Sequence, residues 1–283
     1  MLSILGLGDN TFDVYLDKGL EYPGGNAVNV AVFAARLGCR AAYLGRVGCD
    51  AEGDYLRHCL ALESVDVSRL QVDETHATAW ACVTHQEGDR LFLGSEQGAS
   101  AQLVLAEEDV EQLAAYNLVH TSIYSHLVHQ LPQIRLAAKY LSFDFSDDWT
   151  SDLLNQVAPF LDIGFVSMAD KSEAEVQSVL ARLTGLGTKI AVATLGKAGV
   201  VVFDGVNMYQ AESLPVAVVD TLGAGDGFIA GFLVSWLQYQ SINKALNAGL
   251  AYAAQVCQSE GGFGYPRNTP DDRWEKLKRQ FLM

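Results

Sequence analysis

Apolar residues recur along the chain in two patterns, which alternate almost from end to end. Short blocks of consecutive apolar residues predict strands, and longer segments with helical spacing predict helices. The expected strands are 2–8, 41–45, 117–122, 140–145, 162–167, 188–194, 199–204 and 207–211. The expected helices are 25–37, 52–62, 107–115, 126–138, 151–157, 172–184, 224–238 and 242–257, with a short terminal helix within 266–283. This alternation predicts an α/β fold with a mostly parallel central sheet, covered by helices on both faces.

Two segments break the rhythm. Residues 12–22 alternate weakly between apolar and polar, which predicts a short exposed ribbon. Within 67–93, a strand is expected at 76–84, followed by a hairpin turn at 86–89 and a return strand. An antiparallel insert in a parallel-sheet protein suggests a small β-sheet lid, which residues 12–22 would join. We therefore expect one domain over 1–283, with a lid made from these two insertions.

Composition narrows the classes of function. The 283 residues, 49% of them hydrophobic, supply enough core for one large α/β domain. The net charge of −15 argues against nucleic acid as a partner, because a protein that binds a phosphate backbone needs a basic surface. No apolar run approaches the roughly 18 residues of a membrane span, and the first residues lack the basic region of a signal peptide. The five cysteines have no metal-type spacing, so reduced thiols and a cytoplasmic location are expected.

The most informative stretch is 219–227, Val-Asp-Thr-Leu-Gly-Ala-Gly-Asp-Gly, which directly precedes an apolar helix. Gly223 and Gly225 let the backbone turn tightly and approach a ligand. The free N–H groups of a helix beginning near Ala224 favour a phosphate group. A carboxylate at Asp226 suits such a site if it removes a proton from a hydroxyl that attacks the phosphate. An N-cap aspartate after a glycine turn is the alternative, and this stretch by itself does not decide between them.

A second glycine-rich segment, at 23–38, also leads into a helix. Gly24 and Gly25 form the loop, and Asn26 and Asn29 stand at the mouth of the helix. Their amides donate to and accept from hydroxyls, as a polyol site requires, although ordinary helix capping by either asparagine is the alternative. Apolar spacing predicts one buried face and a glycine stop for this helix, at Val28, Val32, Ala35, Leu37 and Gly38.

In their order, their separation and the length of the chain, these two segments resemble the signature regions of the ribokinase-like (PfkB) family of carbohydrate kinases. The similarity extends from Ile4 to about Gly264, and the segments 8–15, 24–32 and 143–147 are most similar to members that act on fructosamines. The resemblance implies a ribokinase-like three-layer α/β/α core with a small β lid. It also implies ATP-dependent phosphorylation of the terminal primary hydroxyl of fructoselysine or a related fructose–amino acid.

Three other interpretations of the function stay open. A kinase of the same family acting on fructose, ribose or a nucleoside is the first. A sugar-binding sensor without catalysis is the second, although a sensor has no need of a base at Asp226. A dinucleotide-binding oxidoreductase is the third, and the absence of Gly-x-Gly-x-x-Gly after the first strand counts against it.

The resemblance also assigns roles on the acceptor side. Asp13 matches the family's sugar-binding aspartate, with Asp9 as a second contact, and both follow the first strand at the edge where α/β sheets bind ligands. An Asx turn at Asp9 is the alternative. Arg90 on the lid would meet a substrate carboxylate or the transferred phosphate, with a solvated arginine as an equal alternative.

On the nucleotide side, the run Thr-Leu-Gly-x-x-Gly matches the family's nucleotide loop. The implied ATP contacts are Thr194, Gly196, Lys197, Gly199 and Asn247. The family usually carries Asn-x-x-Glu after the strand at 162–167, where this chain has Ser167 and Asp170. These two residues would hold Mg²⁺ through water, unless ATP and water hold it without them. A monovalent cation such as K⁺ and a homodimer formed through the lid complete the expectation, with no nucleic-acid or membrane partner.

Overall fold

The computed structural model describes residues 1–86 and 89–281, and their side chains outside 85–90. Within these residues a nine-stranded main sheet has the order β13-β12-β11-β10-β9-β8-β1-β4-β5. Neighbouring strands are parallel except for the β11–β12 and β12–β13 pairs. The bounds are β1 (Ser3–Gly8), β4 (Arg40–Gly48), β5 (Gln71–Asp73), β8 (Leu118–Ser122), β9 (Leu141–Asp144), β10 (Ile163–Ser167), β11 (Ile190–Thr194), β12 (Val200–Phe203) and β13 (Met208–Ala211).

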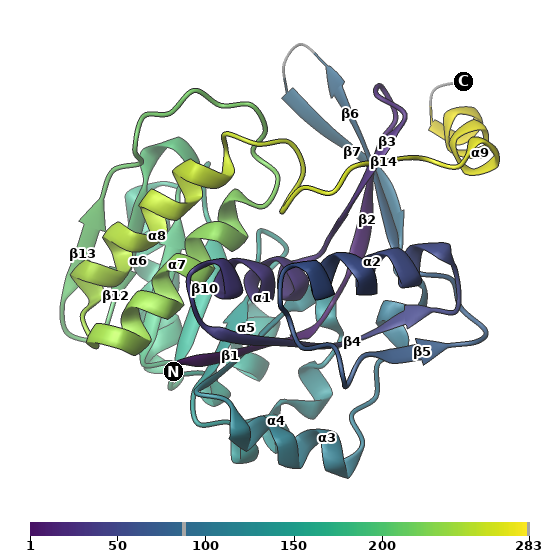
Figure 1. The fold of residues 1–283 in the computed structure, drawn as a ribbon. Coiled ribbons are helices and arrows are strands. Elements are labelled where there is room, and N and C mark those ends of the chain that lie inside the picture. Colours follow the sequence, from purple (N-terminus) through teal and green to yellow (C-terminus); the bar gives the residue numbers. More distant parts are fainter. Residues whose placement is uncertain (87–88, 282–283) are drawn as a thin grey trace.

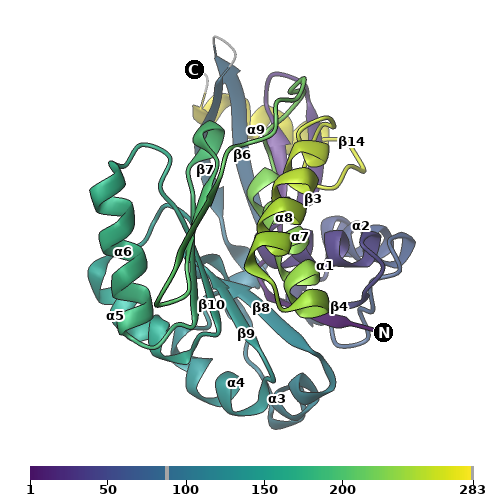
Figure 2. The same ribbon diagram turned by 90° about the vertical axis from the view of Figure 1, so that its left-hand side faces the viewer.

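Helices cover both faces of the main sheet, as Figure 2 shows. One layer holds α1 (Asn26–Arg36), α2 (Ala51–Leu62), α7 (Ala224–Tyr239) and α8 (Ile242–Val256). The other holds α3 (Glu107–Gln112), α4 (Leu131–Ala137), α5 (Ser151–Val157) and α6 (Glu173–Gly185). Successive strand residues point to opposite faces, so Ile4 packs in one hydrophobic core and Leu5 in the other. The predicted three-layer α/β/α core is confirmed.

A second, five-stranded sheet stands apart from the main one and is called the small sheet here (Figure 1). Its order is β14-β3-β2-β6-β7. The bounds are β2 (Thr11–Tyr15), β3 (Leu20–Gly24), β6 (Trp80–Gln86), β7 (Asp89–Glu96) and β14 (Arg267–Asn268), and the terminal helix α9 (Asp271–Phe281) packs beside it. Trp80 of β6 meets the ring of Phe281 at 6.4 Å between centroids, so α9 covers one face of this sheet.

The expected ribbon at 12–22 forms as the β2–β3 pair and joins the small sheet, but its expected exposure is wrong because both strands are largely buried. Residues 12–15 are buried, with β3 on one side of β2 and β6 on the other. The insert at 67–93 is also divided differently from the expectation. Its first strand, β5, extends the main sheet, and β6 begins only at Trp80 because Thr78 binds Asp50 through its N–H and its hydroxyl.

Two helices also differ from their predicted form. The segment 126–138 becomes α-helical only at Leu131, after a short 3₁₀ turn at Val128–Gln130, and Pro132 lies in the first turn of α4. Helix α1 is buried at every residue from 26 to 34 rather than along one face, because it lies between the main sheet and α7. Its predicted stop is confirmed, since Gly38 has a positive φ of 86°. Across 1–86 and 89–281, no helix is both long and apolar enough to span a membrane.

Candidate active site

Asp9 lies just beyond β1 and holds the N-terminus of α1. Its carboxylate accepts hydrogen bonds from the N–H of Asn26 at 2.6 Å and of Ala27 at 3.4 Å. The hydroxyls of Ser122 and Ser125 each donate to it at 2.8 Å. A carboxylate at a helix N-terminus satisfies unpaired amides and complements the helix dipole. Asp9 is therefore a cap supplied by a distant segment, and no Asx turn is formed there.

Asp226 is held by both asparagines of the glycine-rich segment. Asn26 Nδ2 donates to Asp226 Oδ1 at 2.7 Å, and Asn29 Nδ2 donates to Oδ2 at 2.6 Å. The N-cap of α7 is Gly223, in the left-handed region with a φ of 76°, and Asp226 is the third helical residue. The N-cap alternatives are therefore wrong for Asp226 and for both asparagines. The two glycine-rich segments meet at one carboxylate.

A second carboxylate, Asp144 at the end of β9, shares the same amide. Asn26 Nδ2 donates to Asp144 Oδ2 at 3.0 Å, and the N–H of Ser146 donates to Oδ1 at 2.9 Å. Burial raises the pKa of Asp144 to about 7, and the negative charges of Asp226, Asp9 and Asp147 add to the shift. Sequence reasoning left Asp144 out of the site. Its place at the carboxyl end of a central strand is the signal that could have found it.

Asp13 reaches the site from β2 of the small sheet. Its side chain is buried, and a Cβ added to Gly24 would lie 2.6 Å from Asp13 Oδ2 and 3.8 Å from Asn29 Oδ1. Gly25 has a φ of 108°, and a Cβ there would lie 2.6 Å from Asn10 Cα. Both glycines are needed because the chain passes too close to its neighbours for a side chain. The predicted acceptor-side residues other than Arg90 are brought together here.

A glycine-rich loop after α8 completes this side of the site, and the sequence analysis missed it. Tyr15 donates from its hydroxyl to Asp220 Oδ2 at 2.5 Å, and the N–H of Gly261 donates to the same oxygen at 3.1 Å. A Cβ on Gly223 would lie 3.0 Å from Gly262 Cα. The small sheet, the loop before α7 and the loop after α8 are thus joined. The pair Gly261-Gly262 is the sequence signal that could have found this loop.

Open space lies over the first turn of α7. Gly225 is exposed, and a Cβ built on it meets no atom within 4 Å. The N–H of Ala224 donates to the Thr221 carbonyl oxygen at 3.2 Å, so this group is already used in the hydrogen bond that closes the turn. An open helix N-terminus beside a fixed carboxylate provides an anion site and a proton acceptor at one place.

Four of the predicted nucleotide residues lie farther along the same edge of the main sheet, and the fifth, Asn247, is on α8. Thr194 ends β11, two strands from β9, which is about 10 Å at the usual strand spacing. Gly196 and Gly199, both with positive φ, turn the chain between β11 and β12. The other two, Lys197 and Asn247, are exposed. Their contact with a nucleotide stays a prediction.

The predicted metal residues end and follow β10. Ser167 pairs in register with Thr194, and Asp170 is exposed three residues later. Over the described part of the chain, no three His, Cys, Asp or Glu residues gather as a metal site. The magnesium role of Ser167 and Asp170 stays a prediction. Arg90 is in β7, but its side chain lies outside the described residues, so its role stays a prediction too.

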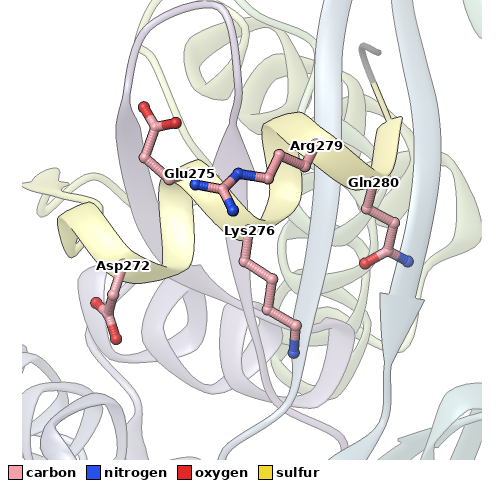
Figure 3. Close-up of a pocket in the computed structure, with 5 residues that line it drawn as sticks. All are labelled: Asp272, Glu275, Lys276, Arg279 and Gln280. Carbon is pink, nitrogen blue, oxygen red and sulfur yellow. The ribbon is translucent and has the colours of Figure 1, made fainter.

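A hollow of about 550 Å³ lies elsewhere, on the outer side of α9. Figure 3 shows that all its lining side chains come from this one helix: Asp272, Glu275, Lys276, Arg279 and Gln280. None of the residues described above lines it. A shallow hollow between charged side chains of one helix offers little to enclose a ligand, so we place the candidate active site at Asp226.

Comparison with known proteins agrees with this geometry. Residues 13–264 match the model of the pfkB family carbohydrate kinases. The chain is 38% identical over 269 residues to fructosamine kinase FrlD of Bacillus subtilis (strain 168), covering 93% of this chain and 94% of that one. It is 37% identical over 266 residues to fructoselysine 6-kinase of Escherichia coli (strain K12), covering 93% and 100%. A solved ribokinase of Arabidopsis thaliana, 21% identical, superposes with a TM-score of 0.78 over 98% of both chains.

Proposed function

The chain belongs to the PfkB family of carbohydrate kinases, and on that premise we propose that it phosphorylates the terminal primary hydroxyl of a fructosamine, such as fructoselysine. The observation that carries the chemistry is the Asp226 carboxylate, fixed by Asn26 and Asn29 beside the open N-terminus of α7. The acceptor class is supported by the two relatives that are 37–38% identical over 93% of the chain.

The residues present fit a nucleotide phosphate. The space over Gly225 admits an anion, and the first turn of α7 directs its dipole there. Bound Mg·ATP supplies the phosphoryl group. Asp226 takes the proton of the attacking hydroxyl, while Asn26 and Asn29 keep the carboxylate in place. The N–H groups of Gly223 and Gly225 stabilise negative charge that develops beside them, whereas the predicted part of Ala224 is excluded because its N–H already donates to the Thr221 carbonyl oxygen.

The remaining assignments follow the family pattern. Thr194, Gly196, Lys197, Gly199 and Asn247 would contact ATP. Ser167 and Asp170 offer the oxygen donors that Mg²⁺ prefers, and they would hold it through water. A monovalent cation such as K⁺ is part of the proposal. The small sheet acts as the lid of a single domain over 1–283, excludes water during transfer, and pairs two subunits in a homodimer. We propose a cytoplasmic location.

The charges around the acceptor position suit a fructosamine. Asp13 and Asp144 lie beside Asn29 and Asn26, so the site presents carboxylates to an acceptor. A secondary ammonium next to the sugar pairs well with them, and Arg90 would meet the amino acid's carboxylate. Plain fructose or ribose leaves these groups unpaired, which lowers transition-state binding.

The proposal is tested by measuring kcat/KM for fructoselysine, fructose-asparagine, fructose and ribose under the same conditions. We expect the fructosamines to be preferred by at least 10-fold, roughly the discrimination that one unpaired buried polar group produces. Equal use of fructose or ribose would overturn the acceptor assignment and leave the kinase assignment standing. Absence of ATP consumption with every acceptor would overturn both.

The base assignment has its own test in Asp226→Asn. The amide keeps the size of the side chain but accepts no proton, so kcat should fall roughly 10²- to 10⁴-fold with the fold and acceptor binding retained. Asp54→Asn, at an exposed position on α2, is the matched control and should keep parental turnover. Near-normal turnover in Asp226→Asn would show that another group takes the proton.

A further inference from the structure

A line of buried polar side chains runs beneath the site from β9 to α1. His120 on β8 lies opposite Ser142 on β9 in the parallel register, and both side chains are completely buried. His120 Nδ1 is 2.8 Å from Ser142 Oγ, and Nε2 is 2.9 Å from Asn26 Oδ1. His120 has no part in the proposed chemistry, yet it contacts the amide of Asn26 that holds Asp226.

The positions of the hydrogen atoms in this line of side chains follow from the donors and acceptors that each group contacts. Asn26 Nδ2 has two hydrogens, and it directs one to Asp226 and one to Asp144. Asn26 Oδ1 must therefore accept from His120 Nε2–H. Burial lowers the pKa of His120 to about 3, so the ring is neutral at pH 7 and carries a single N–H. Its Nδ1 then accepts from the hydroxyl of Ser142.

This arrangement selects one orientation of the Asn26 amide. Turned by 180°, the amide would point its oxygen at the Asp226 carboxylate and its NH₂ at the N–H of His120. Both contacts would be repulsive, and buried polar groups would lose their partners. A neutral ring also fixes the amide without placing a positive charge near Asp226. A cation there would lower the basicity of the carboxylate that takes the proton.

We propose that His120 is a positioning residue for phosphoryl transfer, because its Nε2–H locks the Asn26 amide in the orientation that holds Asp226. This inference rests on the proposed function for its kinetic consequence. The hydrogen-bond line itself is independent of which acceptor is used.

Two substitutions separate positioning from packing. His120→Phe fills the space without a donor, and kcat should fall roughly 10- to 100-fold, the usual cost of losing a partner that orients an active group, with KM for ATP unchanged. His120→Gln places a side-chain N–H near the position of Nε2 and should recover most of kcat. Phe165→Leu is the control, since Phe165 packs against His120 with ring centroids 6.4 Å apart but lies outside the line. Melting curves establish that each variant is folded.

Parental kcat in folded His120→Phe, or equal losses in the Gln and Phe variants, would overturn the proposal. A second measurement needs no turnover: ¹⁵N NMR of His120 should show the neutral Nε2–H tautomer from pH 7 down to about pH 5. The Nδ1–H tautomer or a protonated ring in that range would overturn the inference even if the kinase activity is confirmed. A parent protein without kinase activity, but with the expected tautomer, would overturn the proposed function and retain the hydrogen-bond line.

Discussion

At the residue scale, Gly225 has open space beside it, in which we propose that the γ-phosphate binds. It is exposed, its φ is not in the left-handed region, and an added Cβ meets no atom within 4 Å. Gly225→Val should therefore keep the fold, at a cost of about 1 kcal/mol or less, while the branched side chain occupies the space proposed for the γ-phosphate. We expect a large loss of kcat/KM for ATP.

The measurement is steady-state kinetics with ATP as the varied substrate, combined with thermal unfolding. Gly38→Val tests the opposite case, since that glycine also has open space around it but a positive φ of 86°. There we expect lower stability and unchanged kinetics. Parental kinetics in Gly225→Val would show that the anion does not bind at the first turn of α7.

Asp144 should make stability depend on pH. Its pKa is raised from 3.8 to about 7, chiefly by burial, so between these values the folded state binds more protons at this group than the unfolded chain. The parent therefore loses stability from this group as pH rises through that window. The side chain at this position in Asp144→Asn cannot ionise, so this variant loses no stability from it as pH rises.

We therefore expect the free energy of unfolding of Asp144→Asn, relative to the parent, to increase between about pH 4.5 and pH 8. Urea unfolding at several pH values measures it. Asp54→Asn is the matched control, because it makes the same substitution at an exposed carboxylate. A difference for Asp144→Asn that does not change with pH would contradict the raised pKa.

Among the elements, a partly buried ionic cluster connects the small sheet to α2. Arg267 on β14 lies 2.6 Å from Glu21 of β3 and 2.6 Å from Glu52 of α2. Glu21 has no solvent exposure, and Arg273 of α9 lies 3.4 Å from it. The Arg267 guanidinium also lies 4.9 Å from the centroid of the Phe12 ring. Four elements thus meet at one guanidinium.

Arg267→Ala should destabilise the protein by about 3 kcal/mol or more, because it leaves buried Glu21 without its nearest cation. Arg57→Ala is the matched control, since Arg57 and Asp54 are exposed and 3.9 Å apart, and it should cost no more than about 1 kcal/mol. Chemical denaturation compares the two. Equal costs would show that the cluster does not hold the small sheet in place.

At the scale of the whole molecule, the residues of the proposed acceptor site come from separate parts of the fold. Asp13 comes from the small sheet, Asn26 and Asn29 from α1, and Asp226 from α7. A ligand that contacts these elements together binds the folded state and not the unfolded chain. Acceptor binding should therefore stabilise the complete fold.

Fructoselysine at about 100 times its Kd should raise the free energy of unfolding by about 2.7 kcal/mol. Asp226→Asn is the suitable protein for this experiment, because we expect it to bind the acceptor with strongly reduced turnover. Fructose at the same concentration should stabilise less, since it lacks the ammonium and the carboxylate. Equal shifts in Tm for both sugars would contradict the proposed acceptor class.

Much of this protein is determined by local sequence patterns. The alternation of apolar blocks predicted the order of strands and helices, because periodicity reflects which side of an element is buried. The segment 219–227 predicted a glycine turn followed by a helix with Asp226 near its start, because glycine dihedrals and helix ends are local properties. Family membership followed from two such segments and their separation.

Tertiary structure decided which distant residues share a partner. Asn26 and Asp226 are 200 positions apart, and only the packing of α1 against α7 shows that the amide holds the carboxylate. The same packing made Asp9 a helix cap, added Asp144 and His120 to the site, and buried the strands expected to be exposed. Periodicity carries no information about such pairings, because hydrogen bonds and burial between segments depend on how the elements pack in space.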